Sequence, residues 1–295
     1  MPYAPADGAR IYYEDTGTGT PVIFVHEFGA DFRTWESQVR ALSRQFRCIT
    51  FNARGYPPSD VPTDPALYGH EQAAADIGAV LDHLAIGRAH VVGLSMGAYA
   101  SLVFALRAPA RVSALVLAGI GSGSASADRD GFAAGANALA AVFLEQGAAA
   151  AARGIGVGAT RVQLQNKDPR GWDEFVRYLG EHSPLGSALT LQRYQAMRPT
   201  LYAFEAPLRA LSLPALVICG DEDDPCLEPS LFLKRTLPNA GLLVMPRSGH
   251  GVNLEEPAMF NQALLDFFGL AERGAARERD ARAHGPALAA AGSRP

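Results

Sequence analysis

The chain has 295 residues, of which 48% are hydrophobic and 19% are charged, and its net charge at pH 7 is −4. This length and composition indicate a globular protein with a sizeable core and argue against an intrinsically disordered chain. The small negative charge argues against a nucleic-acid or anionic-membrane partner, because both would require a basic surface.

Apolar runs alternate along the chain with segments of helical periodicity. Strands are expected over residues 10–15, 21–26, 46–55, 90–94, 112–119, 215–220 and 241–246. Helices are expected over residues 34–44, 70–85, 96–108, 229–237 and 256–270. The strands are nearly continuous Val/Ile/Leu runs, as in sheets that are covered on both faces. The pattern therefore predicts an α/β fold: a mostly parallel sheet with helices on both faces.

The alternation is interrupted after Gly119 by an Ala-rich, irregular helical segment. We predict that residues 122–211 form a helical lid inserted between two strands and placed over the carboxyl edge of the sheet. Residues 1–121 and 212–270 would then form the core domain. Residues 271–295 lack a sustained apolar face and are expected to be a flexible C-terminal tail.

The sequence shows no signal for export, membrane insertion or metal binding. The first ten residues lack the basic and apolar regions of a secretory signal, and no apolar run is long enough to span a bilayer, so a cytoplasmic protein is expected. Cys48, Cys219 and Cys226 are not spaced as zinc ligands. We therefore expect no metal and no cofactor.

A G-x-S-x-G motif, "GLSMG" at residues 93–97, lies between an expected strand and an expected helix. A serine at such a sharp turn has a strained backbone, and the close approach of the chain around it requires Gly93 and Gly97. The helix that follows directs free N–H groups and the positive end of its dipole at the turn. The motif predicts Ser95 as a nucleophile and the N–H of Met96 as an oxyanion donor.

A nucleophilic serine needs a base and an acid that orients the base. "GDEDDP" at residues 220–225 and "SGHG" at residues 248–251 each follow an expected strand. Of the seven histidines, His26 and His250 lie at strand ends near the expected site. The order serine, aspartate, His250 along the chain is the order typical of this strand–turn–helix architecture.

With these motifs, residues 8–270 resemble the α/β-hydrolase superfamily; "FNARGYPPSD" and "SGHGVNLEEP" add to the resemblance. The resemblance implies a Ser95–Asp223–His250 triad, because the second aspartate of such a G-x-x-D loop is usually the acid; Asp221 is the alternative. It also implies that the loop after the strand at 21–26 donates the second oxyanion N–H, from Phe28. His26 would then be a buried residue that braces this loop.

Two residues depart from the family pattern: Glu27, where glycine is usual, and Asn52, where aspartate is common. The Glu27 side chain could face away from the site. The alternative is that its carboxylate pairs with an arginine near the site, and Arg54 is the first candidate. Asn52 is expected to be a hydrogen-bonding loop residue.

The expected function is hydrolysis of a small carboxylic ester or lactone through an acyl-enzyme, with a small-molecule substrate. The alternatives are a carbon–carbon bond hydrolase of vinylogous diketones or an enol-lactonase, and a non-catalytic binding protein of the same fold. Aromatic and aliphatic lid residues are expected to line an apolar pocket. The foremost candidates are Trp172, Tyr194, Met197 and Tyr202. The sequence leaves the oligomeric state open, with a homodimer as one option.

Overall fold

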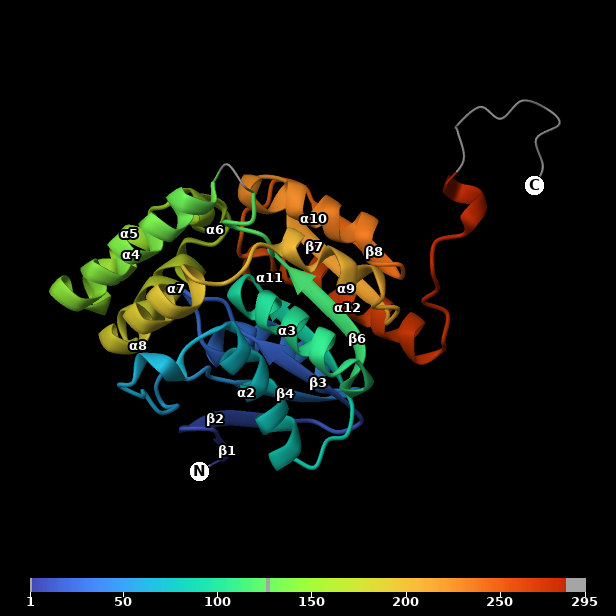
Figure 1. Ribbon diagram of the computed structural model, residues 1–295, viewed down its shortest axis with the longest axis horizontal. Coiled ribbons are helices and arrows are strands. Elements are labelled where there is room, and N and C mark those ends of the chain that lie inside the picture. Colours follow the sequence, from blue (N-terminus) through green and yellow to red (C-terminus); the bar gives the residue numbers. More distant parts are fainter. Residues whose placement is uncertain (1, 126–127, 285–295) are drawn as a thin grey trace.

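The computed structural model describes residues 2–125 and 128–284. An eight-stranded sheet runs through the molecule in the order β1-β2-β4-β3-β5-β6-β7-β8 (Figure 1). Its strands are β1 (Tyr3–Ala6), β2 (Ala9–Thr16), β3 (Thr20–Val25), β4 (Phe46–Phe51), β5 (Ala89–Leu94), β6 (Val112–Ala118), β7 (Ala215–Gly220) and β8 (Ala240–Met245). β1 and β2 pair antiparallel with their neighbours, whereas β3 to β8 run parallel. The predicted α/β fold with a mostly parallel sheet is confirmed.

Helices cover both faces of the sheet, and the side chains of one strand alternate between the two layers. Ile23 of β3 packs in the core cluster of one face, whereas Phe24 packs in the cluster of the other. The first face is covered by α2 (His70–His83), α3 (Met96–Arg107) and α10 (Asp224–Thr236). The second face is covered by α1 (Glu36–Leu42) and α12 (Pro257–Glu272). Burial on both sides explains the nearly continuous apolar strands.

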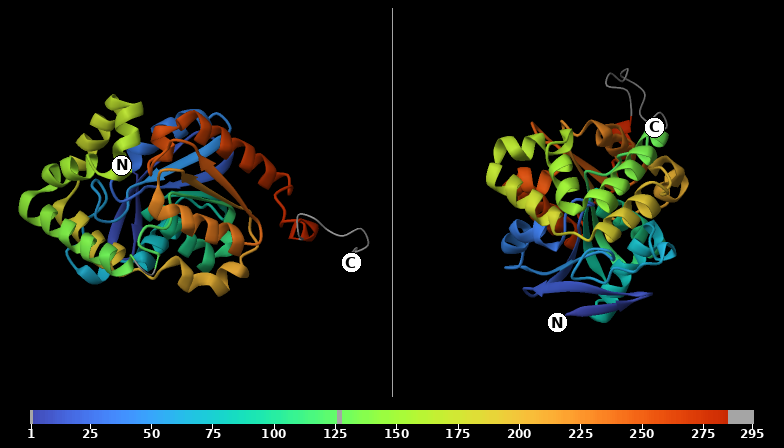
Figure 2. Two further views of the ribbon diagram at one scale, coloured as in Figure 1. Left: turned by 90° about the horizontal axis from the view of Figure 1, so that it is seen from above. Right: turned by 90° about the vertical axis from the view of Figure 1, so that its left-hand side faces the viewer.

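A helical segment lies between β6 and β7. Its elements are α4 (Arg129–Gln146), α5 (Ala148–Gly156), η4 (Ala159–Arg161), α6 (Val162–Lys167), α7 (Pro169–Gly180), α8 (Pro184–Leu189), the π-helix η5 (Thr190–Gln195), η6 (Leu201–Phe204) and α9 (Glu205–Arg209). Helices α4 to α8 gather at one side of the molecule, and the arrowhead of β6 points toward them (Figures 1 and 2). They share an apolar cluster that includes Ala140, Phe143 and Leu179. The segment thus has a core of its own.

The structure differs from the sequence-based expectations at several elements: the strand expected over 46–55 ends at Phe51, because residues 52–55 form a loop, and a short helix at Val252–Glu255 was not expected. β1 was not expected, because Pro5 interrupts the "YAPA" run; an edge strand tolerates this proline, since one side of its ladder is free. Helix α10 begins at Asp224 rather than near Pro229, which lies within the helix. Pro225 stands in the first turn of α10, where a missing N–H costs nothing.

The C-terminal part of the chain beyond α12 is described as far as the short helix η7 (Ala281–His284). Arg282 there is exposed and pairs with Asp280, which is close to it in sequence. The remainder of the expected tail, residues 285–295, lies outside the described residues.

Candidate active site

Ser95 stands at the turn between β5 and α3 with φ 53° and ψ −113°, a conformation that non-glycine residues rarely adopt. The chain passes so close to itself here that a Cβ on Gly97 would lie 2.1 Å from the carbonyl oxygen of Val25. A Cβ on Gly93 would lie 2.5 Å from the carbonyl oxygen of Gly97. The two glycines therefore permit the strained turn, as the motif predicts. Ser95 is half-buried within an otherwise buried segment.

His250 and Asp223 form a buried pair at the same edge of the sheet. Asp223 follows β7 and His250 follows β8, and the histidine Nδ1 lies 2.7 Å from the Asp223 Oδ2. Asp223 is 2% exposed and His250 is 6% exposed. Because parallel strands end at one edge, this pair and Ser95 after β5 share the carboxyl edge of the sheet.

The electrostatics of this pair favour its charged form. Burial disfavours ionisation of Asp223, but the charge and hydrogen bond of His250 outweigh burial and lower the pKa of the carboxyl. Burial also disfavours the imidazolium, but Asp223 and, to a smaller extent, Glu27 together outweigh burial and raise the pKa of His250. With Nδ1 donating to Asp223, Nε2 is the nitrogen available to accept a proton.

Asp221, the alternative acid, binds the backbone of Ser248 and not His250. Its exposed side chain accepts a hydrogen bond from the N–H of Ser248 at 3.1 Å. This contact braces the loop that leads to His250. The geometry thus favours Asp223 over Asp221 as the partner of the histidine.

The loop after β3 is held by His26, which is 1% exposed. The N–H of Ala53 donates to the His26 Nε2 at 3.0 Å, so the proton is on Nδ1, which donates to the carbonyl of Glu27 at 2.7 Å. Burial lowers the pKa of His26 to about 4, so the ring is neutral at pH 7. The position of His26 matches its expected bracing role.

This bracing also directs the N–H of Phe28. In a trans peptide the C=O and N–H point in opposite directions. Because the Glu27 carbonyl points to His26, the Phe28 N–H points away from it. In the described part of the chain, no hydrogen bond is donated by the N–H of Phe28 or of Met96. Both are therefore free to bind an oxyanion.

Glu27 does not pair with Arg54, so that expectation is wrong. Arg54 is fully engaged by Asp76 of α2, with both carboxylate oxygens within 2.8 Å of the guanidinium. Glu27 pairs instead with Arg161 at the end of η4. Its carboxylate also approaches the buried His–Asp pair, since the Glu27 Oε2 lies 3.9 Å from the His250 Nε2. Glu27 thus faces the site rather than away from it.

Asn52 agrees with its expected role in the loop. Its side-chain oxygen accepts from the N–H of Phe32, and its amide donates to the carbonyl of Pro57, both at 2.8 Å. Asn52 therefore joins the loop after β3 to the loop after β4.

The four side chains that were expected to line a substrate pocket do not gather in one place. The Trp172 indole donates to the carbonyl of Gly156 at 2.7 Å and packs within the inserted helices. The Tyr194 hydroxyl donates to the carbonyl of Met96, the residue after Ser95, at 2.7 Å. Met197 is 58% exposed, and Tyr202 packs against Phe232 of α10. Of the four, Tyr194 is the one that contacts the turn at Ser95 within the described part of the chain.

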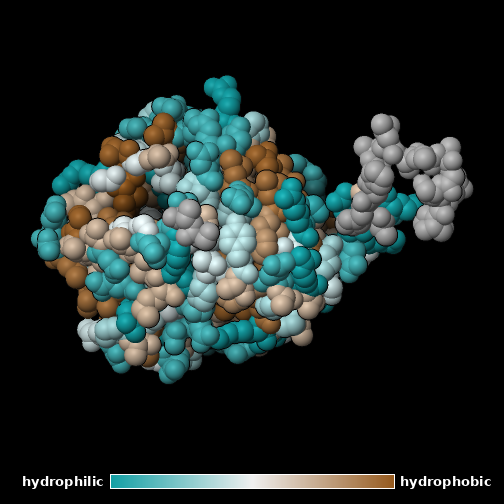
Figure 3. Space-filling view, turned by 45° about the horizontal axis from the view of Figure 1, so that its top comes forward, coloured by the Kyte–Doolittle hydropathy of each residue, from teal (hydrophilic) through white to brown (hydrophobic). Residues whose placement is uncertain are grey.

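Apolar side chains are also exposed over the inserted helices, at the left of Figure 3. The large ones on this segment are Leu144, Val157, Val162, Leu185 and Met197.

Several residues around the site were missed by sequence reasoning. Glu255 of α11 (Val252–Glu255) accepts from the N–H groups of Gly249 and Gly251, and so clamps the His250 loop from both sides. Tyr56 donates to the carbonyl of Phe28 at 3.1 Å. The only signal for Glu255 was its place in the "SGHGVNLEEP" motif. Arg161 was expected only as one of several lid arginines that could bind a substrate carboxylate, and no local signal pointed to it as the partner of Glu27.

Asp223, Cys226 and His250 bring three potential ligand atoms within 4.8 Å of one another. We do not assign them to a metal, because Asp223 and His250 already bond each other. Burial raises the pKa of the Cys226 thiol well above its usual value, so the thiolate that a metal needs is disfavoured. The thiol donates to the carbonyl of Gly119 at 3.3 Å.

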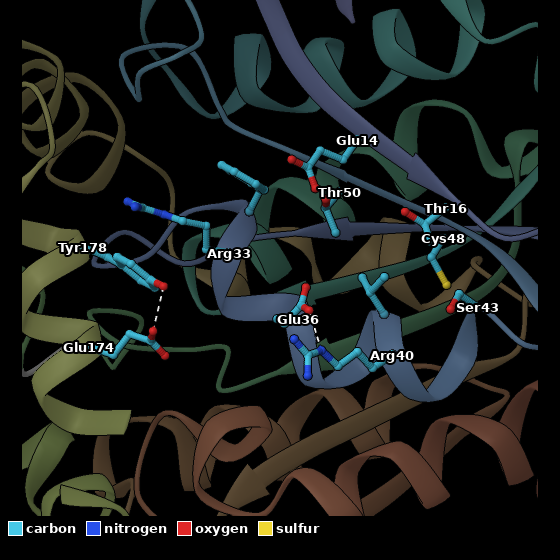
Figure 4. Close-up of a pocket in the computed structure, with 12 residues that line it drawn as sticks. Glu14, Thr16, Arg33, Glu36, Arg40, Ser43, Cys48, Thr50, Glu174 and Tyr178 are labelled. Atoms are coloured by element: carbon cyan, nitrogen blue, oxygen red, sulfur yellow. Dashed lines mark hydrogen bonds and ion pairs between the residues drawn. The ribbon is translucent and has the colours of Figure 1, made fainter. Parts of the chain in front are cut away.

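A cavity of about 570 Å³ lies near α1, β2 and α7, away from this site (Figure 4). Charged residues line it, but its arginines are already engaged: Arg33 by Asp31 and Glu181, and Arg40 by Glu36. Ser95, Asp223 and His250 are not among its lining residues. We therefore do not connect this cavity with the chemistry.

The profile of the "alpha/beta hydrolase fold" family matches residues 20–257. The chain belongs to this family. It is 31% identical over 263 residues to a Mycobacterium tuberculosis protein provisionally named a non-heme bromoperoxidase, covering 88% of this chain and 97% of that one. It is 28% identical to the 2-hydroxy-6-oxononadienedioate/2-hydroxy-6-oxononatrienedioate hydrolase of Burkholderia vietnamiensis, covering 88% of this chain and 90% of the relative.

Solved structures agree with this assignment. A thermophilic esterase from Thermogutta terrifontis has a TM-score of 0.80 at 27% identity, covering 89% of this chain and 94% of the esterase. The enol-lactonase of Burkholderia xenovorans LB400 has a TM-score of 0.79 at 23% identity, covering 91% of this chain and all 100% of the lactonase. The expected superfamily and the expectation of an α/β-hydrolase enzyme are confirmed. Among the described helices we find none with the length and apolar character needed to cross a bilayer.

Proposed function

We propose that the protein is a serine hydrolase of small carboxylic esters or lactones, acting through Ser95, His250 and Asp223. The observation that carries this proposal is the buried 2.7 Å contact between His250 and Asp223 at the sheet edge where the strained Ser95 also lies. A strained serine at the same sheet edge as a buried His–Asp pair is the arrangement that supports acyl transfer.

In the proposed mechanism, the Ser95 Oγ attacks the substrate carbonyl carbon while the His250 Nε2 takes its proton. The N–H groups of Phe28 and Met96 stabilise the oxyanion of the tetrahedral intermediate. Collapse breaks the bond to the alcohol, which leaves with the proton from His250. Water then attacks the acyl-enzyme, again with His250 as base, and releases the acid and free Ser95.

We also propose that residues 122–211 act as a lid on this site. Contacts from the inserted segment to both oxyanion residues support this role. Phe143 of α4 packs edge-to-face on Phe28 with ring centroids 5.9 Å apart, and Tyr194 binds the carbonyl of Met96. The position of the lid therefore bears directly on the oxyanion donors, and a substrate must displace or pass it.

A panel of p-nitrophenyl esters, simple lactones, enol-lactones and vinylogous diketones tests the proposed reaction. We expect multiple turnovers on short-chain esters or lactones. The similarity to a hydrolase of 2-hydroxy-6-oxo-dienedioates favours the carbon–carbon hydrolase as the second candidate. Faster turnover of the vinylogous diketone than of any ester would establish that alternative, and turnover of no member would contradict the proposal.

The pH dependence follows from the state of His250, which must be neutral to accept the Ser95 proton. Asp223 raises the pKa of His250 above the ordinary value of 6.5 despite its burial. We therefore expect kcat/KM to fall as the pH drops through a pKa above 6.5. Rates for a neutral ester between about pH 5 and pH 9 test this. An acid limb below 6.5 would show that burial outweighs the stabilisation of the imidazolium by Asp223 and would contradict this expectation.

A further inference from the structure

The reaction centre contains a charged pair that the proposed mechanism does not use. Glu27 and Arg161 form an ion pair in which both residues are almost fully buried, at 2% and 3% exposed. Burying two charges is unfavourable unless their mutual interaction or some other role offsets the lost hydration. Glu27 also occupies a position where this family usually has glycine, so the charge is not required for the turn.

Apart from the hydrogen bond that Arg161 donates to Glu27, no further hydrogen bond offsets the lost hydration of this pair. Among the described residues, the Glu27 Oε1 and the Arg161 Nε and Nη1 have no hydrogen-bond partner. The guanidinium lies over the ring of Phe175, with its Cζ 4.4 Å from the ring centroid. The pair is thus buried, with the ring of Phe175 against the guanidinium, and a buried charge acts strongly on its neighbours.

His250 is the titratable neighbour on which the charge of Glu27 acts. The Glu27 Oε2 lies 3.9 Å from the His250 Nε2, on the side of the ring opposite Asp223. Arg161 adjoins the same loop: a Cβ on Gly251 would lie 3.2 Å from the Arg161 Nη1. The two charges of the pair therefore act on the imidazole in opposite senses.

An unbalanced carboxylate here would hinder acyl transfer. Glu27 directly precedes Phe28, the proposed oxyanion donor, so its negative charge would oppose the negative charge of the tetrahedral intermediate. The guanidinium of Arg161 offsets this effect. Because Arg161 belongs to the inserted segment, this balance depends on the lid being in place.

We propose that Glu27 and Arg161 are positioning residues that together tune His250: Glu27 stabilises its imidazolium, and Arg161 limits this effect and shields the oxyanion. The inference rests on the proposed function, in which His250 is the base. The pKa of His250 agrees with it: burial lowers the pKa, Asp223 raises it, and Glu27 and Arg161 then raise and lower it, respectively.

Three other titratable groups lie near His250, and each has a bonding partner of its own. Asp223 binds Nδ1, and Cys226 of α10 has its Sγ 4.0 Å from the same nitrogen. Glu255 is engaged by the N–H groups of Gly249 and Gly251. Glu27 and Arg161 take part in none of these hydrogen bonds, so substituting either residue leaves the bonds in place, although the charge of Arg161 also acts on Asp223 and Glu255.

The test is an NMR titration of the His250 imidazole in the full chain, with the signal assigned by its loss in His250→Gln. We expect Glu27→Gln to lower the pKa of His250 by about one unit and Arg161→Met to raise it by about one unit. The double variant should return close to the wild-type value, and Arg161→Lys, which keeps the charge, should stay there. A purely structural role for the pair would not produce opposite shifts.

The buried pair of Arg54 and Asp76 supplies the matched control, because Asp76→Asn also breaks a buried ion pair but lies outside the site. The inference would be overturned if Glu27→Gln and Arg161→Met shifted the pKa of His250 in the same direction. It would also be overturned if their shifts were no larger than the shift caused by Asp76→Asn. If Arg161→Met does not fold, the nearly isosteric Glu27→Gln decides alone: a fall in the His250 pKa supports the inference, and no fall overturns it.

Ester kinetics give a second measurement. Arg161→Met should lower kcat/KM by about 10-fold to 100-fold, and adding Glu27→Gln should recover most of this loss. An equal or greater loss in the double variant would contradict the shielding of the oxyanion. The NMR titration does not depend on turnover, so a failure of the proposed function and a failure of this inference remain distinguishable.

Discussion

Ser95→Ala is expected to lower kcat/KM for an ester by roughly 10⁴-fold or more, because it removes the proposed nucleophile while leaving the oxyanion donors in place. Alanine should preserve the turn, since the strain at this position comes from the backbone and not from the hydroxyl. Steady-state rates of the purified variant, set against the background rate, measure the effect.

Ser101→Ala is the matched control for this substitution. Ser101 lies in the same helix α3, is fully buried, and bonds the carbonyl of Gly97 at 2.7 Å. Its loss should change stability slightly and leave turnover close to the wild-type rate. Comparable rates for Ser95→Ala and the wild type would rule out Ser95 as the nucleophile.

Asp223→Asn is expected to lower kcat by roughly 10⁴-fold with little change in KM. An asparagine can donate its amide N–H to the His250 Nδ1, which places the imidazole proton on Nε2. The histidine then cannot accept the Ser95 proton. The substitution is nearly isosteric, so the fold should be kept, and circular dichroism can verify this.

Asp221→Asn provides the comparison, because the two aspartates belong to one loop. Asp221 is exposed and holds only the N–H of Ser248, so its substitution should reduce kcat by less than about tenfold. A larger loss for Asp221→Asn than for Asp223→Asn would reverse the assignment of the acid.

The features of this molecule that are local in sequence could be predicted from it. The apolar runs of β3 to β7 are largely buried on both faces, and the turn at Ser95 is encoded by Gly93 and Gly97 within five residues. The strand β1 was missed because its pairing with β2, and not its own composition, makes it a strand.

The partner of Glu27 could not be predicted for a related reason. Arg161 is 134 residues away in sequence, and its position depends on how the inserted helices pack. Arg54 is closer to Glu27 in sequence and was therefore the first candidate, but it forms an ion pair with Asp76, which lies 22 residues after Arg54. The lid residues were equally uncertain, because an irregular helical segment does not reveal which face each side chain occupies. Trp172 and Tyr194 accordingly proved to have hydrogen-bond partners within the protein.

The central claim is that Ser95 carries the acyl group during turnover. The most direct measurement is rapid mixing with p-nitrophenyl acetate, acid quenching and peptide mass spectrometry. We predict a burst of about one p-nitrophenol per active site and an acetyl group on the peptide that contains Ser95. Continued turnover with no acyl group on Ser95, at any quenching time and with no burst, would contradict the claim.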